Sequence, residues 1–250
     1  MPEEPVSLLT SDGVRLAARH HPGPADGPCV IVGHGFTCSQ RMKELRHIAG
    51  ILGRDAAVLA LDFRGHGGSG GLSTVGDLEI HDLQAAVEWA GSRYRGVAVV
   101  GFSMGASAAI RHAALMGGVD AVVSVSSPAR WYYRDTVPMR RVHWAVESRL
   151  GRAAVRIGRR TRIAASGWDP VPEAPNEVIG RISCPVLVVH GDADGFFPVD
   201  HGLTLYEAAG EPRELWIEPG FGHAEIAASE DLIARISAWV HATVSGRLRS

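Results

Sequence analysis

The chain has 250 residues, of which 46% are hydrophobic, and a formal net charge of −2. This length suits one α/β domain with a small insertion, and the near-zero charge gives no bias towards nucleic acid as a partner. The three cysteines form neither a disulfide framework nor a zinc-type pair, and no apolar run reaches the ~20 residues of a membrane span. Residues 1–10 lack the pattern of a signal peptide. We therefore expect a cytoplasmic protein without an integral membrane segment.

Short apolar runs alternate with helical patterns along most of the chain. The apolar runs predict strands at residues 30–32, 57–62, 97–101, 121–125, 186–190 and 214–217. Apolar residues at helical spacing predict helices at residues 78–89, 104–115, 203–209 and 230–240. Buried strands that alternate with helices are typical of a parallel sheet covered on both faces. The predicted fold class is therefore α/β, with a mostly parallel central sheet.

One long segment breaks this alternation. Between Ser127 and Ile182 the chain has no strand signal, and three prolines punctuate the end of the segment. Such a segment is too large for a simple loop and too small for a core of its own. We expect a helical cap at residues 128–181, inserted before the last strands of a core formed by residues 1–127 and 182–250.

The predicted cap is strongly basic. Ten arginines and two acidic residues between positions 130 and 162 give this stretch a formal charge of about +8. In one interpretation these arginines pair with acids of the core, while apolar residues of the cap pack on it. The apolar residues in question are Val142, Val146, Leu150, Ala153, Ala154 and Ile157. The two other interpretations are peripheral contact with a membrane surface, and a cap that guides a carboxylate- or phosphate-bearing substrate such as an acyl-CoA thioester.

A candidate nucleophile lies between a predicted strand and a small-residue helix. Residues 101–105 read Gly-Phe-Ser-Met-Gly and fit the pattern G-x-S-x-G. A serine at such a sharp turn has a strained backbone, and its hydroxyl is exposed above the carboxyl edge of the sheet. The flanking glycines are expected where strand and helix cross too closely for larger side chains. Ser103 is therefore the candidate nucleophile, and the alternative is a serine that only caps the helix.

A serine nucleophile needs a base, and the base needs an acid that orients it. The loop after the strand at 186–190 offers Asp192 and Asp194. We favour Asp194 because it lies deeper in the loop, whereas Asp192 directly follows the glycine that ends the strand and is expected to make a turn. His223, in a glycine-rich loop after the last strand, is the candidate base. His190 and the two aspartates could also line a metal site, but no further ligand cluster completes one.

Acyl transfer also requires N–H donors for the charge that develops on the carbonyl oxygen. The amide of Met104 is one candidate donor, and the amide of Phe36, in the turn after the first buried strand, is the other. Residues 65–70 formally match the dinucleotide pattern G-x-G-x-x-G. However, no helix opens directly after them, and Asp82 falls inside a predicted helix rather than at the end of a second strand. We therefore expect neither a bound cofactor nor a metal.

Four stretches together resemble the α/β-hydrolase superfamily, in the branch of serine esterases and of monoacylglycerol-lipase-like and cinnamoyl-esterase-like enzymes. These stretches are residues 34–37, 62–69, 101–105 and 190–194 with 222–223. The resemblance implies an α/β-hydrolase fold and five site residues, three as a triad and two as oxyanion donors: Ser103, Asp194 and His223, and Phe36 and Met104. It also implies that Arg64 and His66 are structural.

The expected function is that of a carboxylic-ester hydrolase that acts through an acyl-enzyme intermediate on a small-molecule ester or thioester. Hydrolysis of a thioester, an amide or a C–C bond could use the same triad. A protein of this fold that binds a ligand with little turnover is an alternative from another class. Turnover of an activated ester that Ser103→Ala abolishes would distinguish the enzyme from the binding protein.

Overall fold

The computed structural model describes residues 3–24 and 27–247. Within them, one sheet has eight strands in the order β1-β2-β4-β3-β5-β6-β7-β8. The strands are β1 (Glu4–Leu9), β2 (Arg15–His21), β3 (Pro28–Gly33), β4 (Ala57–Leu61), β5 (Gly96–Phe102), β6 (Ala121–Val125), β7 (Val186–Gly191) and β8 (Arg213–Glu218). β2 is antiparallel to β1 and β4, and all other neighbours are parallel. The predicted fold class is confirmed, and six strands end at one carboxyl edge.

The N-terminal strands β1 and β2 have no counterpart among the predicted strands. β2 alternates more and less buried positions and carries two arginines and two histidines. β3, β4, β5, β6 and β7 are buried along their whole length instead. A half-buried antiparallel strand lacks the continuous apolar run that reveals a central parallel strand, which explains why the pattern did not predict β1 and β2.

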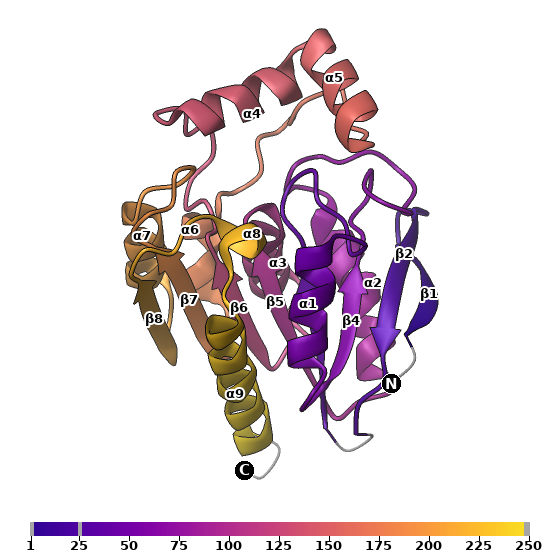
Figure 1. Cartoon of the computed structure of the whole chain (residues 1–250), viewed down its shortest axis with the longest axis vertical. Helices are drawn as coiled ribbons and strands as arrows, with labels where there is room; N and C mark the ends of the chain where they lie inside the picture. The colour runs from indigo at the N-terminus through magenta and orange to yellow at the C-terminus, as the bar shows by residue number, and fades with distance from the viewer. Residues whose placement is uncertain (1–2, 25–26, 248–250) are drawn as a thin grey trace.

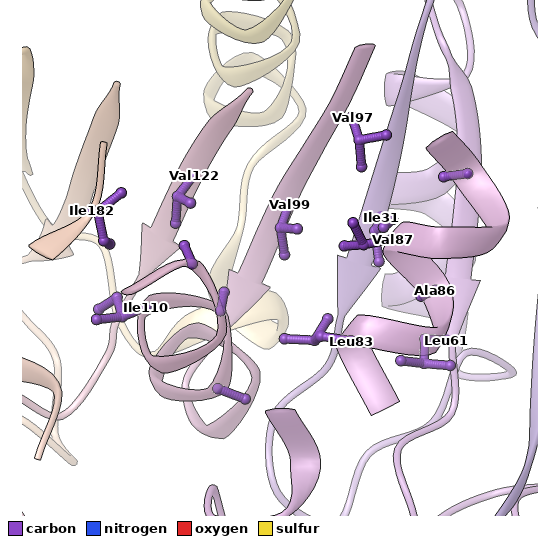
Figure 2. Close-up of a cluster of buried hydrophobic side chains, with 14 of the residues drawn as sticks. Ile31, Leu61, Leu83, Ala86, Val87, Val97, Val99, Ile110, Val122 and Ile182 are labelled. Atoms are coloured by element: carbon purple, nitrogen blue, oxygen red, sulfur yellow. The ribbon is translucent and has the colours of Figure 1, made fainter. Parts of the chain in front are cut away.

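Helices cover both faces of the sheet (Figure 1). On one face lie α1 (Lys43–Leu52) and α9 (Glu230–Arg247), and on the other lie α2 (Glu79–Gly91), α3 (Met104–Leu115) and α7 (Asp200–Ala208). Figure 2 shows the core beneath α2 and α3, where Leu83 and Ile110 lie over Val99 and Val122 of the sheet. Each face therefore has its own apolar core, and the sheet is held as a rigid platform for its carboxyl edge.

Residues 128–181 leave the sheet after β6 and return to it at β7. Their two main helices, α4 (Val137–Glu147) and α5 (Arg149–Arg159), lie beyond the carboxyl ends of the strands (Figure 1). The short helix α6 (Pro175–Val178) instead packs back on α3. In the part of the chain that the structure describes, no helix combines the length and the apolar character needed to cross a membrane.

The chain turns sharply between α4 and α5 at a single serine, which follows the last residue of α4 and caps the N-terminus of α5. Ser148 lies after the last residue of α4, and its Oγ accepts the N–H of Gly151 at 2.8 Å, which caps the first turn of α5. The helices touch closely at this corner, because a Cβ at Gly151 would lie 2.3 Å from the carbonyl oxygen of Trp144. The corner thus fixes which side of α5 faces α4.

Candidate active site

Ser103 lies at the turn between β5 and α3. Its φ is 52°, a left-handed conformation that is strained in a residue with a side chain. Close backbone approach explains both flanking glycines. A Cβ at Gly101 would lie 2.4 Å from the carbonyl oxygen of Gly105, and one at Gly105 would lie 2.4 Å from that of Gly33. The turn therefore places the Ser103 hydroxyl at the N-terminus of α3, where the helix favours negative charge.

His223 reaches Ser103 from the loop after β8. Its Nε2 lies 3.0 Å from Oγ of Ser103, and its Nδ1 lies 2.8 Å from Oδ2 of Asp194. The ring of Phe196 stacks on the imidazole with 4.3 Å between the centroids. Because Nδ1 donates to the carboxylate, Nε2 is left to accept the serine proton, which is the tautomer that a general base requires.

The Asp194 carboxylate is buried and its two oxygens have different partners. Oδ1 accepts the N–H groups of Phe196 at 2.8 Å and Phe197 at 3.0 Å, and Oδ2 faces His223. Burial opposes the charge on this carboxyl, but the hydrogen bond and charge of His223, with those two amides, outweigh it. The pKa of Asp194 is therefore lower than its usual value, and the side chain stays ionised beside the imidazole.

Asp192 and His190 lie close to this site but have other partners. Asp192 is exposed, and its Oδ1 accepts the N–H of Gly220 at 2.6 Å, so that it braces the loop leading to His223. His190 is buried and donates from Nε2 to the carbonyl oxygen of Phe197 at 2.9 Å, and burial lowers its pKa. No group of three or more candidate metal ligands occurs among residues 3–24 and 27–247.

The loop after β3 is anchored by side chains from distant parts of the chain. Three buried groups accept its N–H groups: Glu225 from Gly35 at 2.8 Å, His66 from Thr37 at 3.2 Å and Asp62 from Gln40 at 2.7 Å. Within the described ranges, the amides of Phe36 and Met104 have no such acceptor. Both residues line the same cavity as Ser103. Two free N–H groups beside a serine hydroxyl are what an oxyanion requires.

The neutral state of His66 is part of this anchoring. Its Nε2 accepts from Thr37, so Nδ1 carries the proton and donates to the carbonyl oxygen of Arg64 at 2.9 Å. Burial lowers the pKa of His66 to about 4, and it does the same to neighbouring His34. Both imidazoles are therefore neutral near pH 7 and serve as fixed hydrogen-bonding groups within the loop.

The glycine-rich stretch at residues 65–70 closes around protein groups. The N–H of Gly68 donates to Oδ2 of Asp62 at 2.9 Å. The buried Arg64 guanidinium pairs with Asp82 at 2.7 Å and also with Asp12 at 2.7 Å. The next helix, α2, begins only at Glu79 and so does not open on these glycines. The arrangement does not fit a phosphate-binding turn, which needs a helix N-terminus at the loop.

A cavity of about 760 Å³ lies between residues 128–181, here called the cap, and the carboxyl edge of the sheet, and Ser103 and His223 are among the residues that line it. Its walls are mainly apolar or aromatic and include Phe36, Trp131, Val142, Val146, Trp168 and Ile226. Three arginines of the cap, Arg130, Arg141 and Arg159, also line it. The cavity can therefore hold a largely apolar molecule, with cationic groups available for an anionic part of it.

Glu225 is a site residue that the sequence patterns did not predict. It lies two positions after His223 and is only 3% exposed, and it contacts Gly35 across 190 residues of sequence. It also adjoins Cys38 in the cavity wall. Burial and the Glu225 carboxylate raise the pKa of the Cys38 thiol, so that this thiol stays protonated and does not form the nucleophilic thiolate. Only its position beside His223 could have drawn attention to Glu225.

Comparisons with known proteins agree with this architecture. The family model described as "Alpha/beta hydrolase family" matches residues 29–236. An uncharacterized protein of Mycobacterium tuberculosis is 28% identical over 226 residues, which cover 87% of this chain and 71% of that protein. The uncharacterized protein YqkD of Bacillus subtilis is 29% identical over 218 residues, or 82% and 68% of the two chains. The esterase Pf2001 of Pyrococcus furiosus is similar in structure, with a TM-score of 0.78 and 26% identity over 97% of this chain and 93% of that chain.

Proposed function

The chain belongs to the alpha/beta hydrolase family, and from this premise we propose that it is a serine hydrolase that cleaves carboxylic esters through an acyl-enzyme intermediate. One observation carries the proposal: the hydrogen-bonded series from Ser103 through His223 to Asp194, with distances of 3.0 Å and 2.8 Å. A hydroxyl, an imidazole and a buried carboxylate in this order are the arrangement that activates a serine. The likeness to the esterase Pf2001 supports the ester as the bond that is cleaved.

In the first half of the reaction, Oγ of Ser103 attacks the ester carbonyl carbon while Nε2 of His223 takes the hydroxyl proton. The carbonyl oxygen becomes an oxyanion, and the amides of Phe36 and Met104 donate to it. Asp194 stabilises the imidazolium and keeps its ring in place. The C–O bond to the leaving alcohol then breaks, His223 gives its proton to that alcohol, and an acyl ester of Ser103 remains.

In the second half, water replaces the alcohol. His223 takes a proton from the water as its oxygen attacks the acyl carbonyl, and the same two amides bind the new oxyanion. When this intermediate collapses, the bond to Oγ breaks, Oγ recovers the proton from His223, and the carboxylic acid leaves. The reaction requires no cofactor, since each proton passes through one imidazole.

The cavity supports an apolar substrate for this reaction. Its walls are mainly aliphatic and aromatic, and Trp131 and Trp168 contact each other with 4.9 Å between ring centroids. Burial of an acyl chain or aromatic acid against such walls contributes roughly 25 cal/mol per Å² of apolar surface. We therefore expect esters of bulky apolar acids to be hydrolysed with lower KM than acetyl esters of the same alcohol.

Covalent labelling tests the proposal directly. A fluorophosphonate probe should add once to the wild-type protein, because its phosphorus is attacked as an ester carbonyl would be. Ser103→Ala should give no adduct in intact mass spectrometry. Ser107→Ala is the matched control, since Ser107 lines the same cavity but donates from Oγ to the carbonyl oxygen of Met104. An unchanged adduct in Ser103→Ala would refute Ser103 as the nucleophile.

A further inference from the structure

The cap turns large apolar side chains away from the protein. Leu150 and Ile157 of α5 are 77% and 83% exposed, and Trp144 and Val137 of α4 are 54% and 50% exposed. The prediction that Leu150 and Ile157 pack on the core is therefore wrong. The amphipathic pattern is present, but these two side chains face the solvent. Side chains of this size are usually buried, so exposure of several on one small segment calls for a physical explanation.

The geometry of α5 accounts for this orientation. Gly151 faces α4 at the corner, and successive residues turn by about 100°. Leu150 and Ile157 are seven positions apart and so lie on one side of the helix, about a quarter-turn from the side that faces α4. Arg149 and Arg156 are also seven positions apart and form a second row beside the first. An apolar row thus runs along the exposed side of α5 with a cationic row next to it.

The cationic charge on this surface is not neutralised by the protein. Within the described residues, Arg130 with Asp200 is the single ion pair that joins residues 128–181 to the core, at 3.6 Å. Glu147 of the cap is already bonded by Arg134 and by His143 at 2.9 Å. Six exposed arginines of the cap have no carboxylate partner among the described residues: Arg140, Arg141, Arg149, Arg156, Arg159 and Arg160. The interpretation in which the cap arginines pair with acids of the core is therefore wrong for these six.

We propose that this outer cap surface, formed by Val137, Trp144, Leu150 and Ile157 with the exposed arginines Arg140, Arg141, Arg149, Arg156 and Arg160, binds the surface of an anionic lipid bilayer. A basic amphipathic helix places its apolar side chains at the boundary between head groups and acyl chains, and its arginines beside the phosphates. Trp144 suits that boundary, because indole is apolar with one polar edge.

Charge complementarity favours this occupant over a second copy of the chain. A symmetric dimer through the outer cap surface would place arginines against arginines without acids between them, and like charges at an interface oppose association. An anionic bilayer supplies the missing charge and an apolar layer together. Because Arg141 also lines the cavity, docking would bring the cavity wall to the layer that dissolves apolar esters. The binding itself does not depend on the proposed chemistry at Ser103.

Co-sedimentation with vesicles tests the proposal. The full chain should bind vesicles of phosphatidylcholine mixed with phosphatidylglycerol, bind pure phosphatidylcholine about tenfold less, and lose binding as salt is raised. Leu150→Ser/Ile157→Ser and Arg149→Gln/Arg156→Gln should each lower the partition coefficient about tenfold. All four positions are exposed, and thermal unfolding should confirm that both variants remain folded.

Leu115→Ser/Arg95→Gln is the matched control. Both residues are exposed, and they lie at the C-terminal end of α3 and just before β5, at the edge of the sheet opposite the cap. This variant should bind vesicles as the wild type does. Equal binding to both kinds of vesicle, or unchanged binding of both cap variants, would overturn the proposal. So would light scattering that finds a dimer dissociated by Leu150→Ser/Ile157→Ser, together with no vesicle binding, because the surface would then be an interface between copies.

Discussion

The carboxyl edge of the sheet and the cap above it differ in how they hold charged groups. At the sheet edge, buried Arg64 has two carboxylate partners, and Asp194 has two amides and an imidazole. In the cap, Arg149 and Arg156 are exposed and have no acid among the described residues. An unpaired charge is costly only where it is buried, so burial forces a single arrangement at the sheet edge and leaves the cap free to meet other molecules. Changes at the edge should therefore lower kcat, whereas changes in the cap should alter binding.

The largest effect that would test this difference is expected at Asp194. Asp194→Asn replaces an oxygen that accepts from Nδ1 of His223 by a group that can donate, so the imidazole turns to the wrong tautomer. We expect kcat to fall by about 1,000- to 10,000-fold with little change in KM. Steady-state kinetics on an activated ester, with both parameters determined, would measure it.

The neighbouring aspartate provides the control for that experiment. Asp192→Asn removes the carboxylate that accepts from Gly220 but leaves the partners of His223 in place. We expect it to lower kcat less than about tenfold, because only one exposed hydrogen bond is lost, and to lower thermal stability slightly. If Asp192→Asn lowered kcat more than Asp194→Asn, Asp192 would be the acid that orients His223.

A smaller effect is expected at Glu225, which we regard as a positioning residue for the loop after β3 that carries Phe36, a proposed oxyanion donor. Glu225→Ala would leave the buried N–H of Gly35 without its acceptor, and the neighbouring Phe36 amide would lose its fixed direction. A loss of one oxyanion donor costs about 100- to 1,000-fold in kcat, so a misdirected one should cost about 10- to 100-fold. Kinetics should place this loss in kcat and leave KM nearly unchanged.

Rescue by the matched amide separates positioning from general destabilisation. Glu225→Gln retains an oxygen that can accept from Gly35 and should keep kcat within about threefold of wild type. If Glu225 had a purely structural role, both variants would instead have a lower melting temperature, and neither would show a loss of kcat at unchanged KM. If Gln and Ala lowered kcat equally, the charge of Glu225 rather than its hydrogen bond would be what the site uses.

The two regions also differ in how far local sequence predicts them. Ser103 is flanked by a buried strand, a helix and two glycines, so its turn is encoded within a few residues. The loops that carry Asp194 and His223 follow β7 and β8, so their place at the sheet edge is set by the fold. The deeper position of Asp194 in its loop was enough to favour it over Asp192 as the residue that faces the imidazole. Glu225 was not predicted, because its partner lies 190 positions away and no spacing connects them.

For residues 128–181, the spacing of apolar residues from Val142 to Ile157 predicted helical structure, but neither the break at Ser148 that divides it into α4 and α5 nor which side of these helices would be buried. The spacing of Leu150 and Ile157 is the same whether they face the protein or the solvent. The direction is set by the corner at Ser148, where Gly151 lets α5 approach α4 on one side. This contact depends on how the two helices pack, and it is possible because Gly151 has no side chain. A pattern of apolar residues does not reveal it.

The smallest effect is expected at Arg159, the last residue of α5, which lines the cavity and is exposed. If the cap guides anionic substrates, Arg159→Gln should raise KM about two- to fivefold for an ester that carries a distant carboxylate or phosphate, and should leave a neutral ester of similar size unchanged. The size is modest because exposed ion pairs contribute little, and the difference should vanish at high salt. Arg156→Gln is the control, since Arg156 lies one turn earlier on the same helix but outside the cavity wall. Equal KM values for both esters in wild type and in Arg159→Gln, at any salt concentration, would mean that the cap contributes an apolar wall to the site and no charge.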